Sequence, residues 1–169
     1  DVIKIPNNDL FDKDNYIYLR FIGGGSLFIT NLVYDVENER FLIIKTPNST
    51  SDDNDILLLR EEKNYQDIKI LFPFIPEYYG TINNKDTKWQ IIEFINGNTL
   101  SDIQKCHFSF KEKAIIIFEI LILFSILHSE NYVYRDLKPD NVMIDQNKNI
   151  VLIDFDRMVK IPDYYIDNS

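Results

Sequence analysis

The polar residues of the segment YRDLKPDN, residues 134–141, have the types and spacing that chemistry on a phosphate group needs. Asp136 is a carboxylate that could orient a hydroxyl group or accept its proton, and Lys138 is a cation that could stabilise a transferring phosphoryl oxygen. Asn141 could reach a metal ion with its amide oxygen. A long apolar stretch precedes the segment and a short apolar run follows it, so we expect a loop between a helix and a strand.

This segment resembles the catalytic loop of the eukaryotic-type protein kinase family, H-R-D-L-x-x-x-N, with Tyr134 in the histidine place. The family carries a metal-binding aspartate after a buried strand further on. Here residues 150–153 lead into Asp154-Phe155-Asp156, which resembles the D-F-G motif with Asp156 in the glycine place. The resemblance implies that Tyr134 packs against Phe155.

Two features of the loop and its surroundings extend the resemblance. Lys138 and the proline that follows it are similar to the serine/threonine-specific branch of the family. The interval between the loop and the D-F-G-like triplet fits a two-stranded hairpin that turns at residues 146–149. His128 resembles the structural histidine that ends the helix before the loop.

A glycine-rich stretch upstream resembles the family's nucleotide loop. Residues 23–30 read GGGSLFIT, and glycines let backbone N–H groups approach a phosphate closely. Phe28 fills the third glycine place, where we expect it to stiffen the loop tip, and Thr30 fills the valine place. A triple glycine alone is more often a plain hairpin or a linker; its significance comes from Lys45, which ends an apolar run similar to the V-A-I-K strand.

The resemblance implies that Lys45 contacts the α- and β-phosphates and pairs with a glutamate on the next helix. That helix offers Glu61 and Glu62. Helical periodicity puts Glu61 on the inward, apolar face, and we therefore choose it as the partner. The other members of this face are Leu58, Tyr65 and Ile68. The distance to residues 72–75, which resemble the H-P-N-I motif, leaves Glu62 open as the alternative.

The remaining roles follow from the resemblance. Ile92 would be the gatekeeper at the back of an adenine pocket, and backbone groups of Glu93 and Ile95 would bind adenine. The implied nucleotide-binding residues are Ile22, Gly23, Gly25, Thr30, Ile43, Lys45, Ile92, Glu93, Ile95, Met143 and Asp154. The implied catalytic residues are Asp136, Lys138, Asn141, Lys45 and Glu61, with Asn141 and Asp154 as ligands of Mg²⁺ and with ATP as the phosphoryl donor.

The element pattern predicts an α+β, protein-kinase-like fold in three parts: a lead-in (1–15), a small lobe (16–95) and the start of a large lobe (96–169). The predicted strands cover residues 16–22, 28–34, 40–45, 78–82 and 89–94, with a turn at 83–85 and one helix from about residue 56. The chain breaks at residues 96–98, the candidate lobe boundary. Helices are predicted near 99–105 and over 111–129.

Composition restricts the partners and the compartment. The net charge of −9 argues against nucleic acid or an anionic membrane surface as the main partner. A single cysteine, Cys106, excludes an internal disulfide and fits a reducing compartment, so we expect an intracellular, cytoplasmic protein. The most apolar stretch, residues 114–127, is interrupted by Glu119 and is predicted to be a buried helix rather than a membrane span.

These features predict an ATP- and magnesium-dependent protein kinase that phosphorylates serine and threonine hydroxyls of a protein substrate. The first alternative, suggested by Phe28, Asp156 and the early end of the chain, is a pseudokinase or truncated remnant that binds a nucleotide or a partner. A small-molecule kinase is the second, but such enzymes generally lack Lys138 and its proline. Because the family's activation segment and later helices are absent from the sequence, we expect a fragment with little activity, poor solubility and an exposed face on the helix around 114–127.

Overall fold

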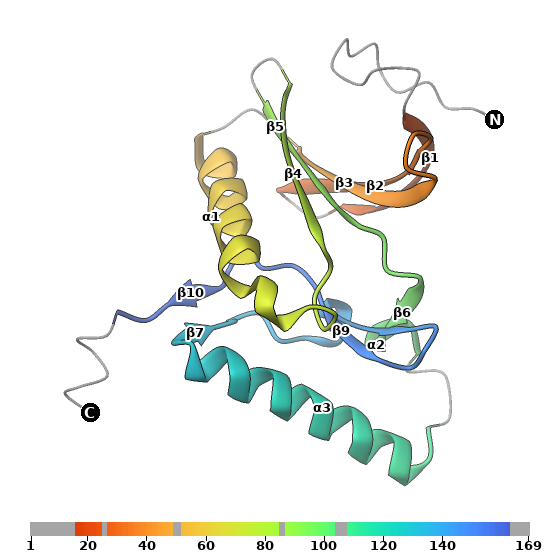
Figure 1. Ribbon diagram of the computed structural model, residues 1–169, viewed down its shortest axis with the longest axis vertical. Coiled ribbons are helices and arrows are strands. Elements are labelled where there is room, and N and C mark those ends of the chain that lie inside the picture. Colours follow the sequence, from red (N-terminus) through yellow and green to blue (C-terminus); the bar gives the residue numbers. More distant parts are fainter. Residues whose placement is uncertain (1–15, 25–26, 49–51, 85–86, 104–107, 163–169) are drawn as a thin grey trace. The chain divides into compact units, whose positions relative to one another are not determined.

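The computed structural model describes residues 16–24, 27–48, 52–84, 87–103 and 108–162 (Figure 1). They belong to two compact units. The first contains the described residues up to Lys63 together with Glu77–Phe94, and the second contains Asn64–Pro76 and the described residues from Ile95 onward. The predicted lead-in, residues 1–15, and Gly25 of the glycine-rich stretch lie outside the described residues.

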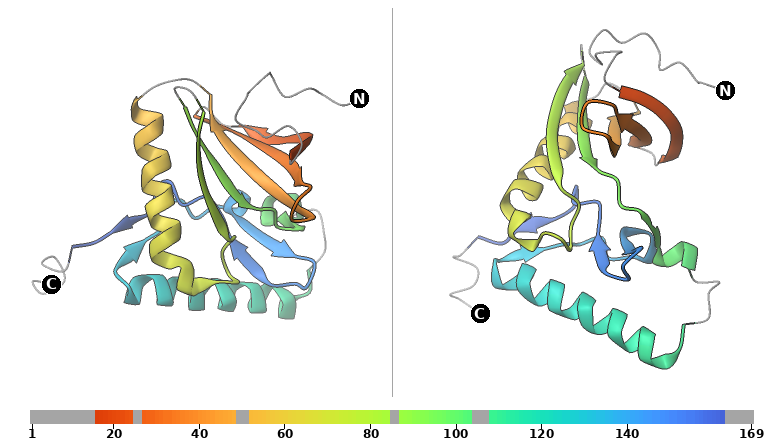
Figure 2. Two further views of the ribbon diagram at one scale, coloured as in Figure 1. Left: turned by 45° about the horizontal axis from the view of Figure 1, so that its top comes forward. Right: turned by 45° about the vertical axis from the view of Figure 1, so that its right-hand side comes forward.

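A five-stranded antiparallel sheet forms the first unit, which confirms the predicted small-lobe sheet. Its strands run in the order β1-β2-β3-β5-β4 (Figure 2). They are β1 (Tyr16–Gly24), β2 (Phe28–Asp35), β3 (Arg40–Pro47), β4 (Tyr78–Asn84) and β5 (Thr87–Glu93). Because β4 continues through Asn84, the turn after it comes later in the chain than the predicted 83–85.

One face of this sheet holds a small apolar core. Its fully buried members are Val33, Leu42, Ile44 and Ile91, and Tyr16, Tyr79, Ile82 and Trp89 pack against them. These buried residues alternate with less buried ones along β3, as expected for a strand whose two faces meet different surroundings. The turn between β2 and β3 is held by the buried Asp35, which accepts hydrogen bonds from Asn38 and Arg40.

The main helix of this region, α1 (Asp52–Ile68), begins four residues before the predicted start. The sequence there is rich in aspartate, which looked like a polar loop. Acidic residues are also favourable in the first turn of a helix, because the backbone dipole is positive there. The 3₁₀ helix η1 (Lys69–Leu71) follows α1 directly.

The second unit contains two small sheets and two α-helices. Strands β6 (Gly97–Thr99), β8 (Val142–Asp145) and β9 (Ile150–Leu152) form one sheet, and β7 (Tyr132–Val133) pairs with β10 (Val159–Lys160) in the other. The hairpin between β8 and β9 turns where predicted, with the Asp145 N–H donating to the Asn149 carbonyl. The helices are α2 (Leu100–Ile103) and α3 (Phe110–Ser129), and the 3₁₀ helix η2 (Pro139–Asn141) precedes β8.

Residues 97 and 98, predicted to lie in a chain break, instead belong to β6, while the two units divide between Phe94 and Ile95, one residue before the predicted limit. Gly97 explains the difference. A Cβ atom at this position would lie 2.2 Å from the carbonyl oxygen of Ile144 in β8, so only glycine allows the two strands to approach so closely. The glycine is therefore a requirement of strand pairing.

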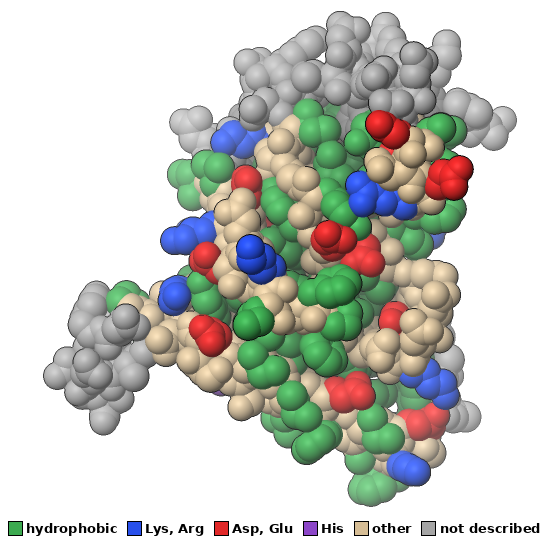
Figure 3. Space-filling model, in the orientation of Figure 1, with side chains coloured by type: hydrophobic (Ala, Val, Ile, Leu, Met, Phe, Trp, Pro, Cys, Tyr) green, Lys and Arg blue, Asp and Glu red, His purple; other side chains and the backbone are tan. Residues whose placement is uncertain are grey.

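Helix α3 lies along β7 and β9 (Figure 2). It starts with a capping box formed by Ser109 and Glu112. Only Leu123 and Leu127 of this helix are buried. The apolar face is otherwise exposed, which corrects the prediction of a buried helix and confirms the expected exposed face (Figure 3). Its exposed side chains include Ile115, Ile117, Phe118, Leu121, Ile122 and Ile126. Among the described residues, no helix is long and apolar enough to cross a membrane.

Candidate active site

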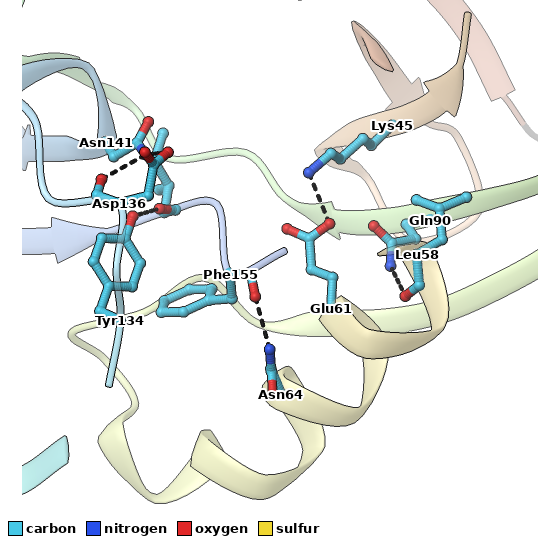
Figure 4. Close-up of polar contacts among 10 residues, drawn as sticks. Lys45, Leu58, Glu61, Asn64, Gln90, Tyr134, Asp136, Asn141 and Phe155 are labelled. Carbon is cyan, nitrogen blue, oxygen red and sulfur yellow. Dashed lines mark hydrogen bonds and ion pairs between the residues drawn. The ribbon is translucent and has the colours of Figure 1, made fainter. Parts of the chain in front are cut away.

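Lys45 and Glu61 form a buried ion pair in the first unit. The Lys45 Nζ on β3 lies 2.7 Å from the Glu61 Oε2 on α1, and only 8 % of Lys45 and 1 % of Glu61 are exposed (Figure 4). Glu62, the alternative partner, instead accepts a hydrogen bond of 3.0 Å from the Thr81 hydroxyl on β4. The pairing chosen from helical periodicity is therefore confirmed, while the catalytic role of the pair remains a prediction.

The residue in the third glycine place lies close to this lysine. Phe28 is buried at the beginning of β2, and the Lys45 Nζ lies 4.8 Å from the centre of its ring. A cation above an aromatic face is attracted by the ring's electrons. Phe28 thus helps to hold the Lys45 ammonium group.

Cross-strand register places several predicted nucleotide contacts on one face of the sheet. Thr30 is the partner of Lys45 across β2 and β3, and Ile43 is the partner of Ile92 across β3 and β5. Because Ile43 and Lys45 are two residues apart on one strand, all four side chains point to the same side. Ile22 falls at a register shift between Phe21 and Gly23 and is exposed.

One of the backbone groups predicted to bind adenine, the Glu93 N–H, already has a hydrogen-bond partner in the protein. The Glu93 N–H donates to the Glu77 carbonyl at 2.8 Å, and the Glu77 N–H donates back to the Glu93 carboxylate at 2.9 Å. The Glu93 N–H is thus paired within the first unit. Ile95 and Met143 belong to the second unit, where both are half-buried.

In the second unit, Asp136 is held between two polar partners. The Lys138 Nζ lies 2.8 Å from its Oδ2. The Asn141 Nδ2 donates to the same oxygen at 2.8 Å and to the Asp136 carbonyl at 3.1 Å (Figure 4). Burial alone would raise the pKa of Asp136, but the hydrogen bonds from Lys138 and Asn141 and the lysine charge lower it below its ordinary value. The carboxylate is thus kept ionised and oriented.

The loop carrying Asp136 is supported by Tyr134. This side chain is 1 % exposed, its hydroxyl donates to the Ile153 carbonyl, and its ring packs edge-on against Phe155 with the ring centres 5.6 Å apart. Burial and the nearby Asp154 carboxylate raise the pKa of Tyr134, so the phenol keeps its proton. The predicted contact between the two rings is confirmed.

Asn141 and Asp154 fit a magnesium ion by their chemistry. Both Asn141 Nδ2 contacts go to Asp136, so its amide oxygen is turned away from that residue. Asp154 follows β9 with φ at 66°. The pKa of Lys138 is raised mainly by its hydrogen bond to Asp136 and further by the negative charge of Asp154. Mg²⁺ prefers oxygen ligands and usually keeps several waters beside one or two carboxylates and substrate phosphates. Within the described ranges, no cluster of three His, Cys, Asp or Glu side chains could hold a metal ion.

Two buried amides escaped the sequence analysis. The Gln90 Nε2 donates to the Leu58 carbonyl of α1 at 2.9 Å, and the Asn64 Nδ2 on α1 donates to the Phe155 carbonyl (Figure 4). The Asn64 Nδ2 also donates to the Met158 carbonyl. Gln90 is 0 % exposed and Asn64 4 %. The only sequence signal was a polar residue at the border of an apolar helical face or inside a strand. The neighbouring residues do not indicate which backbone carbonyl such a side chain would bind.

Comparisons with known proteins agree with these site features. A sequence profile of the protein kinase domain matches residues 16–164, nearly the whole chain. The chain therefore belongs to the protein kinase domain family.

Its relatives carry kinase names. It is 26 % identical over 160 residues to cAMP-dependent protein kinase type 3 of Saccharomyces cerevisiae, with 90 % of this chain and 39 % of that protein covered. It is 28 % identical over 169 residues to Protein kinase 2 of Dictyostelium discoideum, with 95 % and 34 % covered. It is 28 % identical over 146 residues to serine/threonine-protein kinase sgk-1 of Caenorhabditis elegans, with 84 % and 32 % covered. The chain thus spans only about a third of the length of the curated relatives it matches.

Proposed function

We propose that the protein containing this chain is an ATP- and Mg²⁺-dependent protein kinase that phosphorylates serine and threonine hydroxyls. The observation that carries the proposal is the ionised Asp136, held by Lys138 and Asn141 in the loop of a protein kinase domain. The Lys138–proline pair and the Caenorhabditis elegans relative named a serine/threonine-protein kinase support the choice of acceptor.

The loop supplies the groups that transfer requires. The Asp136 carboxylate orients the acceptor hydroxyl and takes its proton as the oxygen bonds to the γ-phosphorus and the bond to ADP breaks. Lys138 neutralises charge on the transferring phosphoryl oxygens. When bound through Asn141 and Asp154, Mg²⁺ supplies further neutralisation of phosphate charge.

Lys45 binds the α- and β-phosphates in this proposal, and Glu61 fixes the ammonium group for that task. The 2.7 Å contact and the deep burial of Glu61 support the role, because a flexible surface lysine would lose conformational freedom on binding. Thr30, Ile43 and Ile92 share the face of Lys45 and are the proposed apolar contacts of adenine.

The test is replacement of Asp136 by asparagine in the full natural polypeptide. Loss of a general base typically costs on the order of 10²–10⁴ in rate, so phosphoryl transfer from ATP to a protein substrate should fall by about that factor. Nucleotide affinity, measured by titration with a fluorescent ATP analogue, should change little. Transfer at the wild-type rate by the variant would show that Asp136 is not the base.

A second candidate is a pseudokinase that binds a nucleotide or a protein partner without transfer. The burial of Phe28 beside Lys45 favours it, because a bulky ring stands where the family's loop has glycine. The same titration separates the two: nucleotide binding by the wild-type protein with no transfer to any acceptor supports the pseudokinase.

A further inference from the structure

Asn64 makes two hydrogen bonds that no part of the proposed reaction uses. Its side-chain nitrogen lies 2.7 Å from the carbonyl oxygen of Phe155 (Figure 4) and 3.0 Å from that of Met158. All three residues are buried, with Asn64 4 % exposed and Phe155 and Met158 0 % exposed. A primary amide has two N–H donors, so one side chain can serve both carbonyls.

These carbonyls belong to the turn that follows Asp154. The Met158 N–H also donates to the Phe155 carbonyl at 3.2 Å, which closes the turn. On the other side of Asp154, the Ile153 carbonyl accepts the Tyr134 hydroxyl. The carbonyl before Asp154 and the carbonyl after it are therefore each held by a buried side-chain donor.

Asp154 needs such support for two reasons. Its φ of 66° lies in the left-handed region, which is unfavourable for residues other than glycine. In addition, the turn at residues 155–158 contains no glycine, since Asp156 occupies the place where the family's motif has one. The backbone conformation must then be fixed by contacts from outside the turn, and Asn64 supplies them.

We propose that Asn64 is a positioning residue that holds the turn after Asp154 and thereby keeps the Asp154 carboxylate in place for the metal ion. This inference rests on the proposed role of Asp154 as a magnesium ligand. Asn64 lies on α1, one turn after Glu61, so the helix that carries the glutamate of the ion pair also carries the residue that orders the metal-binding segment.

The test compares three variants of the full natural polypeptide. Asn64→Leu replaces the side chain by an apolar one of similar size and so removes both donors. Asn64→Asp keeps the volume but places a carboxylate, which cannot donate, opposite the two carbonyls. The aspartate variant therefore remains informative if leucine does not fit. Tyr132→Phe is the matched control, because it removes a 2.7 Å hydrogen bond from Tyr132 to Asp67 on the same helix and leaves both hydrogen bonds of Asn64 in place.

The first readout is hydrogen–deuterium exchange of peptides covering residues 153–158, without nucleotide or metal; these peptides exclude the β10 residues that pair with Tyr132 and Val133. Two lost hydrogen bonds should accelerate exchange by about tenfold or more in both Asn64 variants. Tyr132→Phe should leave these peptides unchanged. Wild-type exchange in both Asn64 variants, or equal acceleration in the control, would overturn the inference.

The second readout is the affinity for Mn²⁺ in the presence of a non-hydrolysable ATP analogue, followed by electron paramagnetic resonance. It should weaken by about threefold to tenfold in the Asn64 variants and stay unchanged in Tyr132→Phe. Faster exchange with unchanged Mn²⁺ affinity would overturn the link to the metal. The variant Asp154→Ala distinguishes a failure of the inference about Asn64 from a failure of the proposed function. If Asp154→Ala binds Mn²⁺ like the wild type, Asp154 is not a metal ligand. The exchange measurement still decides whether Asn64 holds the turn.

Discussion

The buried pair of Lys45 and Glu61 allows stability and function to be separated by substitution. The two charges are 2.7 Å apart, and their side chains are 10 % and 1 % exposed. Removing one partner of such a pair leaves an uncompensated buried charge and costs about 3–5 kcal/mol, whereas replacing both partners by apolar residues is often neutral or stabilising. Lys45→Met and Glu61→Leu should therefore each lower the free energy of unfolding by about 3–5 kcal/mol.

The double variant Lys45→Met/Glu61→Leu should recover most of this loss. A methionine can keep the contact with the Phe28 ring, since its sulfur also packs favourably on aromatic rings. We expect the double variant to lie within about 1 kcal/mol of the wild type, which is a coupling energy of several kcal/mol. Phosphoryl transfer should nevertheless be absent from all three variants, because Lys45 is needed for the phosphates.

Trp89 provides the assay. It is the only tryptophan of this chain and packs against the apolar core of the first unit, so its fluorescence follows the unfolding of that unit in urea. A double variant destabilised by the sum of the two single effects would refute the reasoning, since it would show that the two side chains do not compensate each other. Transfer activity in the double variant would refute the role of Lys45.

Two further predictions concern Asp136 and Gly97. The pKa of Asp136 is lowered in the folded protein, so the ionised carboxylate stabilises the fold above the pKa of an unfolded aspartate, and this stabilisation is lost as the pH falls through the folded pKa. A plot of kcat/KM against pH should therefore stay level down to below the ordinary aspartate range. Lys138→Met should raise the pH at which kcat/KM falls on the acidic side. A limb at the same pH in both proteins would contradict the coupling. Gly97→Ala should lower the thermal midpoint, because its Cβ would meet the Ile144 carbonyl at 2.2 Å, whereas Gly23→Ala, where a Cβ meets nothing within 4 Å, is the control and should change it little.

Sequence alone was sufficient where the determining interactions are local or periodic. Alternation predicted the five strands of the first unit, and helical spacing chose Glu61 over Glu62, because burial on one face of a helix depends mainly on spacing. The hairpin that turns at residues 146–149 was predicted from the interval between the loop and the D-F-G-like triplet, and the structure closes it with the hydrogen bond from the Asp145 N–H to the Asn149 carbonyl.

Features that depend on distant partners were missed. Gly97 was interpreted as part of a chain break. Its role is instead to let its strand, β6, approach Ile144 of β8, which is far along the sequence. The roles of Asn64 and Gln90 could not be predicted, because a buried amide can be interpreted only once its acceptor carbonyl is known. The start of α1 was placed late, since the same aspartate-rich composition suits both a loop and the first turn of a helix.

The most direct measurement is transfer of labelled γ-phosphate from ATP by the full natural polypeptide to three peptides that differ only in a serine, threonine or tyrosine acceptor. We predict label on the serine and threonine peptides, none on the tyrosine peptide, and none on any peptide without Mg²⁺. Binding of ATP without label on any of the three would contradict the central claim and identify the domain as a binding module.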